Sequence, residues 1–347
     1  MRLLIYADPH WSQYSSIVRK RGVEFSVRLE NLINSLNWVI ETADSRRCAG
    51  VVCLGDFFDK SDLNAEEITA LGRIHWGTIP HFFLVGNHEM GSNDRLMSST
   101  NIFNLLKGEV KSEVEFVEMG DVTLGFIPYI LESNRKKEFE RLGGECLSDI
   151  VPKNKRVILF SHNDLQIQYG EYKSTVGFTV EDIENSCDLF INGHLHNGEK
   201  VTDKIINLGN LTGQNFSEDA RKYVHNVMIL DTDTLKYEFI PNPWALNFYK
   251  VEFGSIISGE YNIKLLPANS VVSIKCNECY YPDVLNIVEE SKKIIAYRIT
   301  VVRDAVEHTD EATLISVDDH LKQFNDYIKE TVGSSDLVLS ELYEVCK

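Results

Sequence analysis

Five short motifs in the N-terminal part of the chain carry side chains that can bind metal ions. Each contains aspartate, histidine or asparagine, which offer oxygen and nitrogen donors, and none contains cysteine. They are Asp8-Pro9-His10, Gly55-Asp56-Phe57-Phe58-Asp59, Gly86-Asn87-His88-Glu89, Ser161-His162-Asn163 and Gly193-His194-Leu195-His196. Mixed imidazole and carboxylate sets suit manganese, iron or zinc better than calcium. Two divalent ions about 3.5–4 Å apart can activate water and offset the charge of a phosphoryl group, so these residue types indicate two-metal phosphoester chemistry.

Every motif follows a short apolar run that predicts a buried strand. The runs lie at residues 3–6, 51–54, 82–85, 157–160 and 189–191. In open α/β sheets, ligands bind at the carboxyl ends of the strands. We therefore expect the five segments to converge on one cleft, where the glycines of the motifs let the chain turn sharply.

The rest of the first 240 or so residues alternates apolar runs with amphipathic stretches. This pattern predicts an α/β fold with a two-sheet core, the sheets being stacked face to face between helices. The Gly120-Asp121 pair between two apolar runs predicts a hairpin. The expected elements are helices at 25–43 and 65–74, hairpin strands at 115–117 and 122–127, and a final run of antiparallel strands at 205–208, 226–230 and 236–240.

The pattern changes near Pro241-Asn242-Pro243. Strands at 271–274 and 294–302, with a helix at 282–291 between them, predict a small α+β unit. Two apolar stripes at helical spacing follow. We therefore expect a core domain at 1–245, a small α+β cap domain at 246–305 and a C-terminal helical segment at 306–347.

Composition and charge narrow the class of protein. The chain has 347 residues, of which 43% are apolar and 25% charged, and these values exclude a disordered chain, a collagen and a disulfide-rich miniprotein. It carries 52 acidic and 35 basic residues, a net charge of −17 that by itself disfavours nucleic-acid binding. Bound metal ions, a local basic stripe or a partner subunit could reverse the local field.

The lengths of the apolar runs and the number of cysteines indicate the cellular compartment. No apolar run approaches the roughly 20 residues that a membrane span needs, and the first apolar stretch is short for a signal peptide. The seven cysteines are odd in number and scattered along the chain, which favours reduced thiols. These observations predict a cytoplasmic protein that does not bind a membrane.

The order and spacing of the five motifs resemble those of the calcineurin-like metallophosphoesterase superfamily over about residues 1–240. Within it, the chain looks most like the SbcD-type nuclease subunit of the SbcCD DNA repair and recombination nucleases, some of which are encoded by phages. Residues 55–59 resemble the GDxFD form of that branch, and residues 206–212 and 215–218 resemble its glycine turn and its F-x-E segment. The resemblance implies a two-metal-dependent DNA exonuclease or endonuclease.

The resemblance also implies which side chains bind the metal. Two divalent ions, expected to be Mn²⁺, would be held by seven side chains, with Asp56 bridging them. The set for one ion is Asp8, His10, Asp56 and His196, and the set for the other is Asp56, Asn87, His162 and His194.

Three further residues of the motifs are expected to support the reaction. His88 would lie beside the phosphate, stabilise developing charge and help to protonate the leaving oxygen, a role that suits an imidazole near neutral pH. Asp59 stands where some relatives carry histidine, and it would assist catalysis at the same site. Glu89 stands where the family commonly has aspartate, and it would orient a ligand.

DNA and a partner protein are the expected binding partners. The basic cluster Arg19-Lys20-Arg21, with Arg28 nearby, is either a solvated turn or a surface that faces the DNA groove. The helical segment at 306–347 either packs on its own domain or grips the coiled coil of an SbcC-type ATPase, an SMC-like protein. The resemblance further implies that the cap domain at 246–305 binds DNA and helps to position it, and that the protein is a homodimer within a heterotetramer.

Two other functions stay open at this stage. An enzyme of the same fold could act as a phosphatase or phosphodiesterase on a small or protein substrate, which the cap and the terminal helices disfavour. A noncatalytic metal-binding scaffold subunit is the second alternative. The presence of His88 and of every expected ligand disfavours it.

Overall fold

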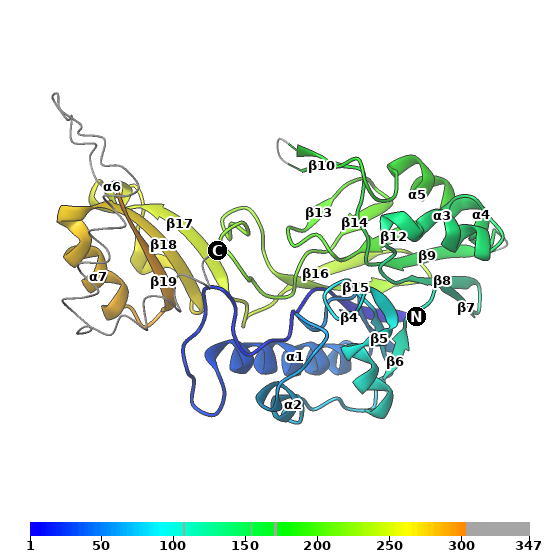
Figure 1. Cartoon of the computed structure of the whole chain (residues 1–347), viewed down its shortest axis with the longest axis horizontal. Helices are drawn as coiled ribbons and strands as arrows, with labels where there is room; N and C mark the ends of the chain where they lie inside the picture. Colours follow the sequence, from blue (N-terminus) through cyan, green and yellow to red (C-terminus); the bar gives the residue numbers. More distant parts are fainter. Residues whose placement is uncertain (107, 154, 170–171, 303–347) are drawn as a thin grey trace, which may run out of the picture. The chain divides into compact units, whose positions relative to one another are not determined.

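The computed structural model describes residues 1–302 except 107, 154 and 170–171, and two six-stranded sheets form its core (Figure 1). The first sheet has the order β16-β15-β1-β2-β3-β6. Strands β1, β2, β3 and β6 run parallel, whereas β15 is antiparallel to both β1 and β16. The bounds are Arg2–Tyr6 (β1), Gly50–Cys53 (β2), His81–Leu84 (β3), Glu109–Lys111 (β6), Asn226–Asp231 (β15) and Tyr237–Pro241 (β16).

The second sheet has the order β13-β14-β12-β9-β8-β7. Its four central strands run parallel, and β7 and β13 pair antiparallel at the two edges. The predicted hairpin is present, because β7 and β8 pair across Gly120, whose φ is 63°. The bounds are Glu115–Met119 (β7), Val122–Ile127 (β8), Arg156–Ser161 (β9), Leu189–Asn192 (β12), Glu199–Lys200 (β13) and Ile205–Asn207 (β14).

Strand β1 shows how the layers pack. Its side chains alternate between the two faces of the sheet. Leu4 and Tyr6 are buried in a cluster that includes helices α1 (Val27–Ser45) and α2 (Ala65–Leu71). Leu3 and Ile5 are buried on the other face, in a cluster with strands of the second sheet. Both faces of the first sheet are therefore shielded from solvent at β1. This explains why the sequence of the strand is a continuous apolar run.

Three helices cover the outer face of the second sheet, as Figure 1 shows. They are α3 (Glu132–Arg141), α4 (Leu147–Ile150) and α5 (Val180–Ser186). The sequence analysis did not predict them. In α3 only Phe139 is buried, so the helix has no apolar stripe that a periodicity argument could detect. With α1 and α2 on the other side, the predicted α/β fold of two sheets stacked between helices is confirmed.

One predicted feature of the sheets is wrong. The strands at 205–208, 226–230 and 236–240 do not form a single antiparallel run. Strand β14 lies in the second sheet, parallel to β12, whereas β15 and β16 lie in the first. Each strand is a short apolar run, and local periodicity does not state which strand it will pair with.

Short elements lie between the main strands. A two-stranded hairpin, β4 (Met90–Gly91) and β5 (Asp94–Ser98), and the helix η1 (Ser99–Leu105) follow β3. A second small hairpin, β10 (Gln168–Tyr169) and β11 (Tyr172–Lys173), follows β9.

Residues 246–302 contain a three-stranded parallel sheet with the order β17-β18-β19. Their core includes Val284 and Val288 of helix α7, which begins and ends within one residue of the predicted helix. The bounds are Asn247–Glu252 (β17), Phe253–Ile257 (α6), Ile263–Leu265 (η2), Ser270–Asn277 (β18), Glu278–Tyr280 (η3), Tyr281–Glu290 (α7) and Ile294–Val302 (β19). Phe248 and Val271 also pack against Val18 and Phe216 of the core.

The predicted helical segment at 306–347 lies outside the described residues, as do the last residues of the predicted cap. The division at 245/246 stays a prediction, since residues 1–302 form one compact unit. Among the helices that the structure describes, none is both long and apolar enough to span a bilayer.

Candidate metal centre

The five motifs meet at the carboxyl ends of parallel strands from both sheets. Asp8 and His10 follow β1, Asp56 follows β2, and Asn87 follows β3. The second sheet contributes His162 after β9 and the pair His194 and His196 after β12. The structure thus brings together all seven residues that the sequence analysis expects to bind metal.

Four of these residues have a left-handed backbone. The φ angles are 50° at Asp8, 49° at His10, 45° at Asp56 and 71° at His194. This conformation costs a non-glycine residue on the order of 1–3 kcal/mol and persists where the surrounding structure determines it, often at functional sites. Hydrogen bonds hold the turns, from His10 N to Asp56 O (3.0 Å) and from His194 N to the Asp8 carboxylate (3.1 Å).

The expected ligands form two clusters of donor atoms, and a third group joins His10 and Asp56 with the exposed His88. In the first, donor atoms of Asp8, His10 and His196 lie within 4.8 Å of one another, and the Nε2 atoms of the two histidines are 3.1 Å apart. In the second, donor atoms of Asp56, His162 and His194 lie within the same limit.

Asn87 and Asp56 complete this arrangement. Asn87 Oδ1 lies 3.0 Å from His194 Nδ1 and 3.2 Å from His162 Nε2, so it belongs to the second cluster. Asp56 Oδ2 lies 3.1 Å from His162 Nε2 and 3.8 Å from His10 Nε2. Asp56 therefore faces both clusters, as a bridging carboxylate must.

Each histidine has one nitrogen directed away from the clusters, and an oxygen acceptor lies beside it. His10 Nδ1 contacts Asp59 Oδ1 (3.0 Å), and His162 Nδ1 contacts the carbonyl of Leu54 (2.7 Å). The corresponding acceptors are Asp164 Oδ1 for His194 Nε2 (3.1 Å) and Glu218 Oε1 for His196 Nδ1 (2.9 Å). Such acceptors place the proton on the outer nitrogen and leave the inner nitrogen as a bare lone pair.

When the protons lie on the outer nitrogens, most of the atoms that face the interior of the clusters are hydrogen-bond acceptors. Two bare nitrogens 3.1 Å apart, as in His10 and His196, repel unless a proton or a cation lies between them. The same holds for His194 Nδ1 and Asn87 Oδ1 at 3.0 Å. The donor set therefore fits divalent metal ions on the chemistry of its atoms, with imidazole and carboxylate ligands that suit a first-row metal.

The ionisable groups of the centre perturb one another strongly. Burial lowers the pKa of His162, but the carboxylates of Asp56, Asp8 and Glu89 together outweigh burial and raise that pKa to about 9. Burial opposes ionisation of Asp56, yet the charge of His162 brings the pKa of this carboxyl well below its usual range. Without metal, protons on the imidazoles offset the negative charge of the carboxylates. Bound metal ions would offset this charge instead.

His88 lies at the edge of the centre and is exposed. Its ring centroid is 4.6 Å from that of His10, and its backbone N–H donates to Asp56 Oδ1 (2.9 Å). Its Nδ1 lies 3.2 Å from the carbonyl of Asp59 and 3.6 Å from the Asp59 carboxylate. Asp59 thus contacts both His10 and His88, and it lies where the expected supporting role requires.

Glu89 is fully buried behind the centre. Burial, reinforced by the charge of Asp56, raises its pKa to about 8. Its Oε1 accepts a hydrogen bond from the N–H of Gly86 (3.0 Å). Gly86 is itself required, because a Cβ at this position would collide with the Asp56 carboxylate. Glu89 therefore holds the motif turn, and within the described part of the chain no hydrogen bond joins its carboxylate to an expected ligand side chain.

Two residues that hold histidines were missed by the sequence analysis. Asp164 stands two residues after His162 but contacts His194, 30 residues away. Glu218 is fully buried and also accepts hydrogen bonds from Asn210 Nδ2 (2.9 Å) and from the backbone of Gln214 (2.7 Å). Glu218 lies in the F-x-E segment that supports the resemblance. The sequence did not indicate that its carboxylate contacts His196.

The predicted DNA-binding residues have different surroundings. Arg19 and Lys20 are exposed, and Arg21 forms an ion pair with Glu66. Arg28, by contrast, is buried, and it donates to the carbonyls of Gly213 (2.9 Å) and Pro9 (3.0 Å). Its guanidinium is occupied within the protein, so its position does not support the expected DNA contact. It instead ties the loop of the first motif to the segment after β14.

We expect Glu218→Gln to weaken metal binding about 10–100-fold, since partners of ligating histidines commonly contribute that much. The substitution keeps the shape of the side chain but removes the charge beside His196. Calorimetric titration of the metal-free protein with Mn²⁺ measures the effect. Glu199→Gln, on an exposed position of β13, is the matched control. Equal affinities for Glu218→Gln and the parent would contradict the role of Glu218.

Comparison with known proteins agrees with this geometry. Residues 1–198, more than half of the chain, match the calcineurin-like phosphoesterase family, and the chain belongs to that family. The fold and the centre thus define a metal-dependent phosphoester hydrolase.

Among curated proteins, the chain is similar to the DNA double-strand break repair protein Mre11 of Sulfurisphaera tokodaii, with 27% identity over 184 residues. The match covers 51% of this chain and 46% of the relative. Mre11 of Methanosarcina acetivorans is 26% identical over 208 residues, 58% of this chain and 31% of the relative. The chain therefore matches less than half the length of either relative.

Among solved structures, an archaeal phosphodiesterase aligns with a TM-score of 0.35 and 16% identity. The alignment covers 70% of this chain and 99% of that one.

Proposed function

We propose that this protein is a metal-dependent DNA nuclease, the nuclease subunit of an SbcCD-like repair or recombination complex. The observation that carries the proposal is the pair of donor clusters that Asp56 faces, with the exposed His88 beside them. The similarity to two Mre11 proteins supports DNA as the substrate. The proposal extends the family assignment from phosphoester hydrolysis in general to the phosphodiester bonds of DNA.

The residues around the centre have separate tasks in such a reaction. Two divalent ions, when bound, would supply Lewis-acid activation of water and of the phosphoryl group. The buried Asp8, Asp56 and His162 would hold the ions, and burial restricts the movement of their side chains. His88 is exposed at the edge, where it can donate a proton to the leaving oxygen of the substrate.

Asp59 would keep His88 in place for that proton transfer. Burial opposes ionisation of Asp59, but its hydrogen bond with His10 lowers its pKa, so the carboxylate stays charged. A charged carboxylate 3.6 Å from His88 Nδ1 helps to hold the ring in place.

The remaining parts of the proposal rest on the resemblance to SbcD-type subunits. They are Mn²⁺ as the physiological ion, an SbcC-type ATPase as the partner, a homodimer within a heterotetramer, and a cytoplasmic location. The imidazole-rich donor set agrees with Mn²⁺ but suits other first-row metals as well.

The test is degradation of end-labelled linear duplex DNA by the metal-free chain to which Mn²⁺ is added, alone and with an SbcC-type partner. We expect cleavage that needs Mn²⁺ and stops with EDTA. Bis(p-nitrophenyl) phosphate is assayed in parallel. Hydrolysis of this small diester without cleavage of any DNA would favour a small-substrate phosphodiesterase. Metal binding without hydrolysis of either would favour a scaffold.

A further inference from the structure

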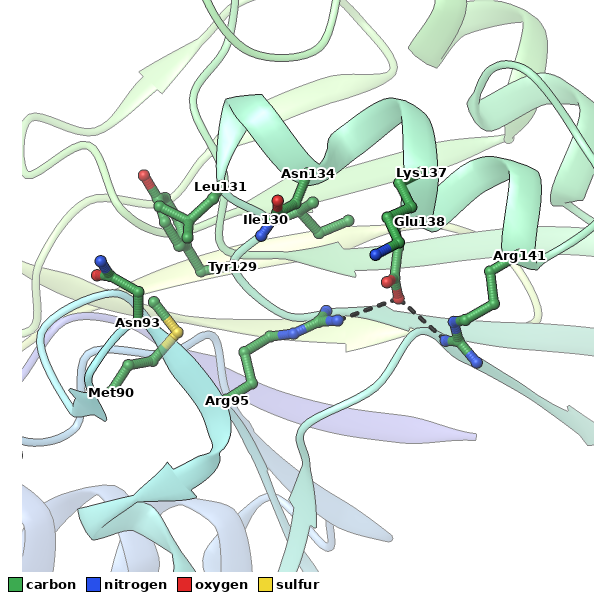
Figure 2. Close-up of a pocket in the computed structure, with 10 residues that line it drawn as sticks. All are labelled: Met90, Asn93, Arg95, Tyr129, Ile130, Leu131, Asn134, Lys137, Glu138 and Arg141. Carbon is green, nitrogen blue, oxygen red and sulfur yellow. Dashed lines mark hydrogen bonds and ion pairs between the residues drawn. The ribbon is translucent and has the colours of Figure 1, made fainter.

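A pocket of about 290 Å³ lies between the β4–β5 hairpin and helix α3 (Figure 2). Its polar lining residues come from both elements and from the segment after β8. They include Asn93, Arg95, Tyr129, Lys137, Glu138 and Arg141. None of the seven expected metal ligands lines this pocket.

The pocket carries an excess of positive charge. Figure 2 shows Arg95 and Arg141 converging on Glu138, whose Oε1 accepts from Arg95 Nη2 (3.1 Å) and from Arg141 Nη2 (3.0 Å). Lys137 is exposed and has no ion pair within the described part of the chain. Three cations thus face one carboxylate, in a chain whose net charge is −17.

Arg95 also has spare hydrogen-bonding capacity. Its Nη1 is buried and has no partner among the described residues. Its guanidinium is held in place by Glu138, with only 19% of the side chain exposed. A fixed arginine with an unused N–H pair is a suitable donor for an oxyanion, because the fork of the guanidinium matches phosphate oxygens.

The pocket adjoins the metal centre through Tyr129. The ring of this residue lies 5.5 Å from that of His194 and 6.3 Å from that of His162, measured between centroids. The β4–β5 hairpin, which forms the other wall of the pocket, is also connected to the centre. Its first strand, β4, begins at Met90, directly after the third motif. A ligand that extends from the metal centre past Tyr129 would therefore enter the pocket.

We propose that this pocket binds a phosphate group of the substrate strand, next to the phosphate that is cleaved, with Lys137 and Arg95 as its contacts. The inference rests on the proposed function, since it requires a substrate with more than one phosphate. Phosphates recur at about 3.4 Å of axial rise along one strand, so a strand bound at the centre carries further charges past its neighbours.

The test compares Lys137→Ala with Lys136→Ala, a matched control. Lys136 is the adjacent residue of α3, but its side chain is 85% exposed, lies outside the pocket and pairs with Glu140 at 3.9 Å. For each protein, kcat/KM is measured with Mn²⁺ on an oligonucleotide and on bis(p-nitrophenyl) phosphate, which has a single phosphate. The readout is the ratio of the two values.

We expect Lys137→Ala to lower this ratio about five- to tenfold, mainly through KM for the oligonucleotide, as loss of a charged phosphate contact does. Its kcat/KM should also depend less steeply on salt. Lys136→Ala should keep the parent ratio. Glu138→Gln should raise the ratio, because it removes the negative charge that faces the three cations of the pocket and keeps an oxygen that can accept from the arginines.

The outcomes separate this inference from the proposed function. A parent that cleaves the oligonucleotide, together with a Lys137→Ala ratio equal to the parent ratio, overturns the pocket as a phosphate site and leaves the nuclease standing. A parent that hydrolyses only the small diester overturns the nuclease, and the pocket assignment with it.

Discussion

Asp56→Asn should lower phosphoester hydrolysis about a thousandfold or more, since a shared metal carboxylate accounts for several kcal/mol of transition-state stabilisation. Asp56 is 1% exposed and faces both donor clusters. Asparagine keeps the volume but loses the charge and one acceptor oxygen. Activity on bis(p-nitrophenyl) phosphate and the number of Mn²⁺ ions bound per chain measure the effect.

The Asp56 experiment needs a control for charge alone. Asp203→Asn removes one carboxylate at a position that is 96% exposed and paired with Lys200, so it should keep both activity and metal content. We expect Asp56→Asn to bind fewer ions than the parent while remaining folded. Full metal content with full activity in this variant would rule out Asp56 as the bridge.

His88→Ala should lower kcat for DNA about 10²–10⁴-fold, the usual contribution of a general acid or base. Metal content should stay at the parent level, because His88 is exposed at the edge of the centre and is not one of the expected ligands. The effect on bis(p-nitrophenyl) phosphate should be smaller, since nitrophenolate leaves readily without a proton.

His75→Ala is the control for His88→Ala, because His75 is exposed and lies away from all five motifs. Two results would count against His88 as the acid. One is a loss of bound metal in His88→Ala, which would make it a ligand. The other is an equal loss of activity on both substrates, which would point to a role in binding or in charge stabilisation.

The parts of the centre that could be predicted from the sequence are those set by local pattern. Apolar runs gave the strands, and each motif residue stands directly after one, so convergence followed from the geometry of parallel sheets. The left-handed backbone at Asp8, His10 and Asp56 was not predicted, because these residue types do not require it.

The parts that could not be predicted depend on contacts between distant residues. Glu218 meets His196 across 22 residues, and no spacing rule links them. Arg28 stands close to a basic cluster and looks like part of a charged surface, but the helix turns its side chain into the protein. The pocket cations Arg95 and Arg141 are likewise separated by strands β6 to β8, so only the folded chain shows them together.

The centre is divided between the two sheets, and this division has a consequence for the stability of the fold. Asp8, His10, Asp56 and Asn87 follow strands of the first sheet, and the other three expected ligands follow strands of the second. Ions held between them would act as a cross-link between the layers. By thermodynamic linkage, an ion at a hundredfold excess over its Kd adds about 2.7 kcal/mol to the free energy of unfolding. The melting temperature would then follow the concentration of free metal, and a chelator would weaken the junction between the layers as well as stop the reaction.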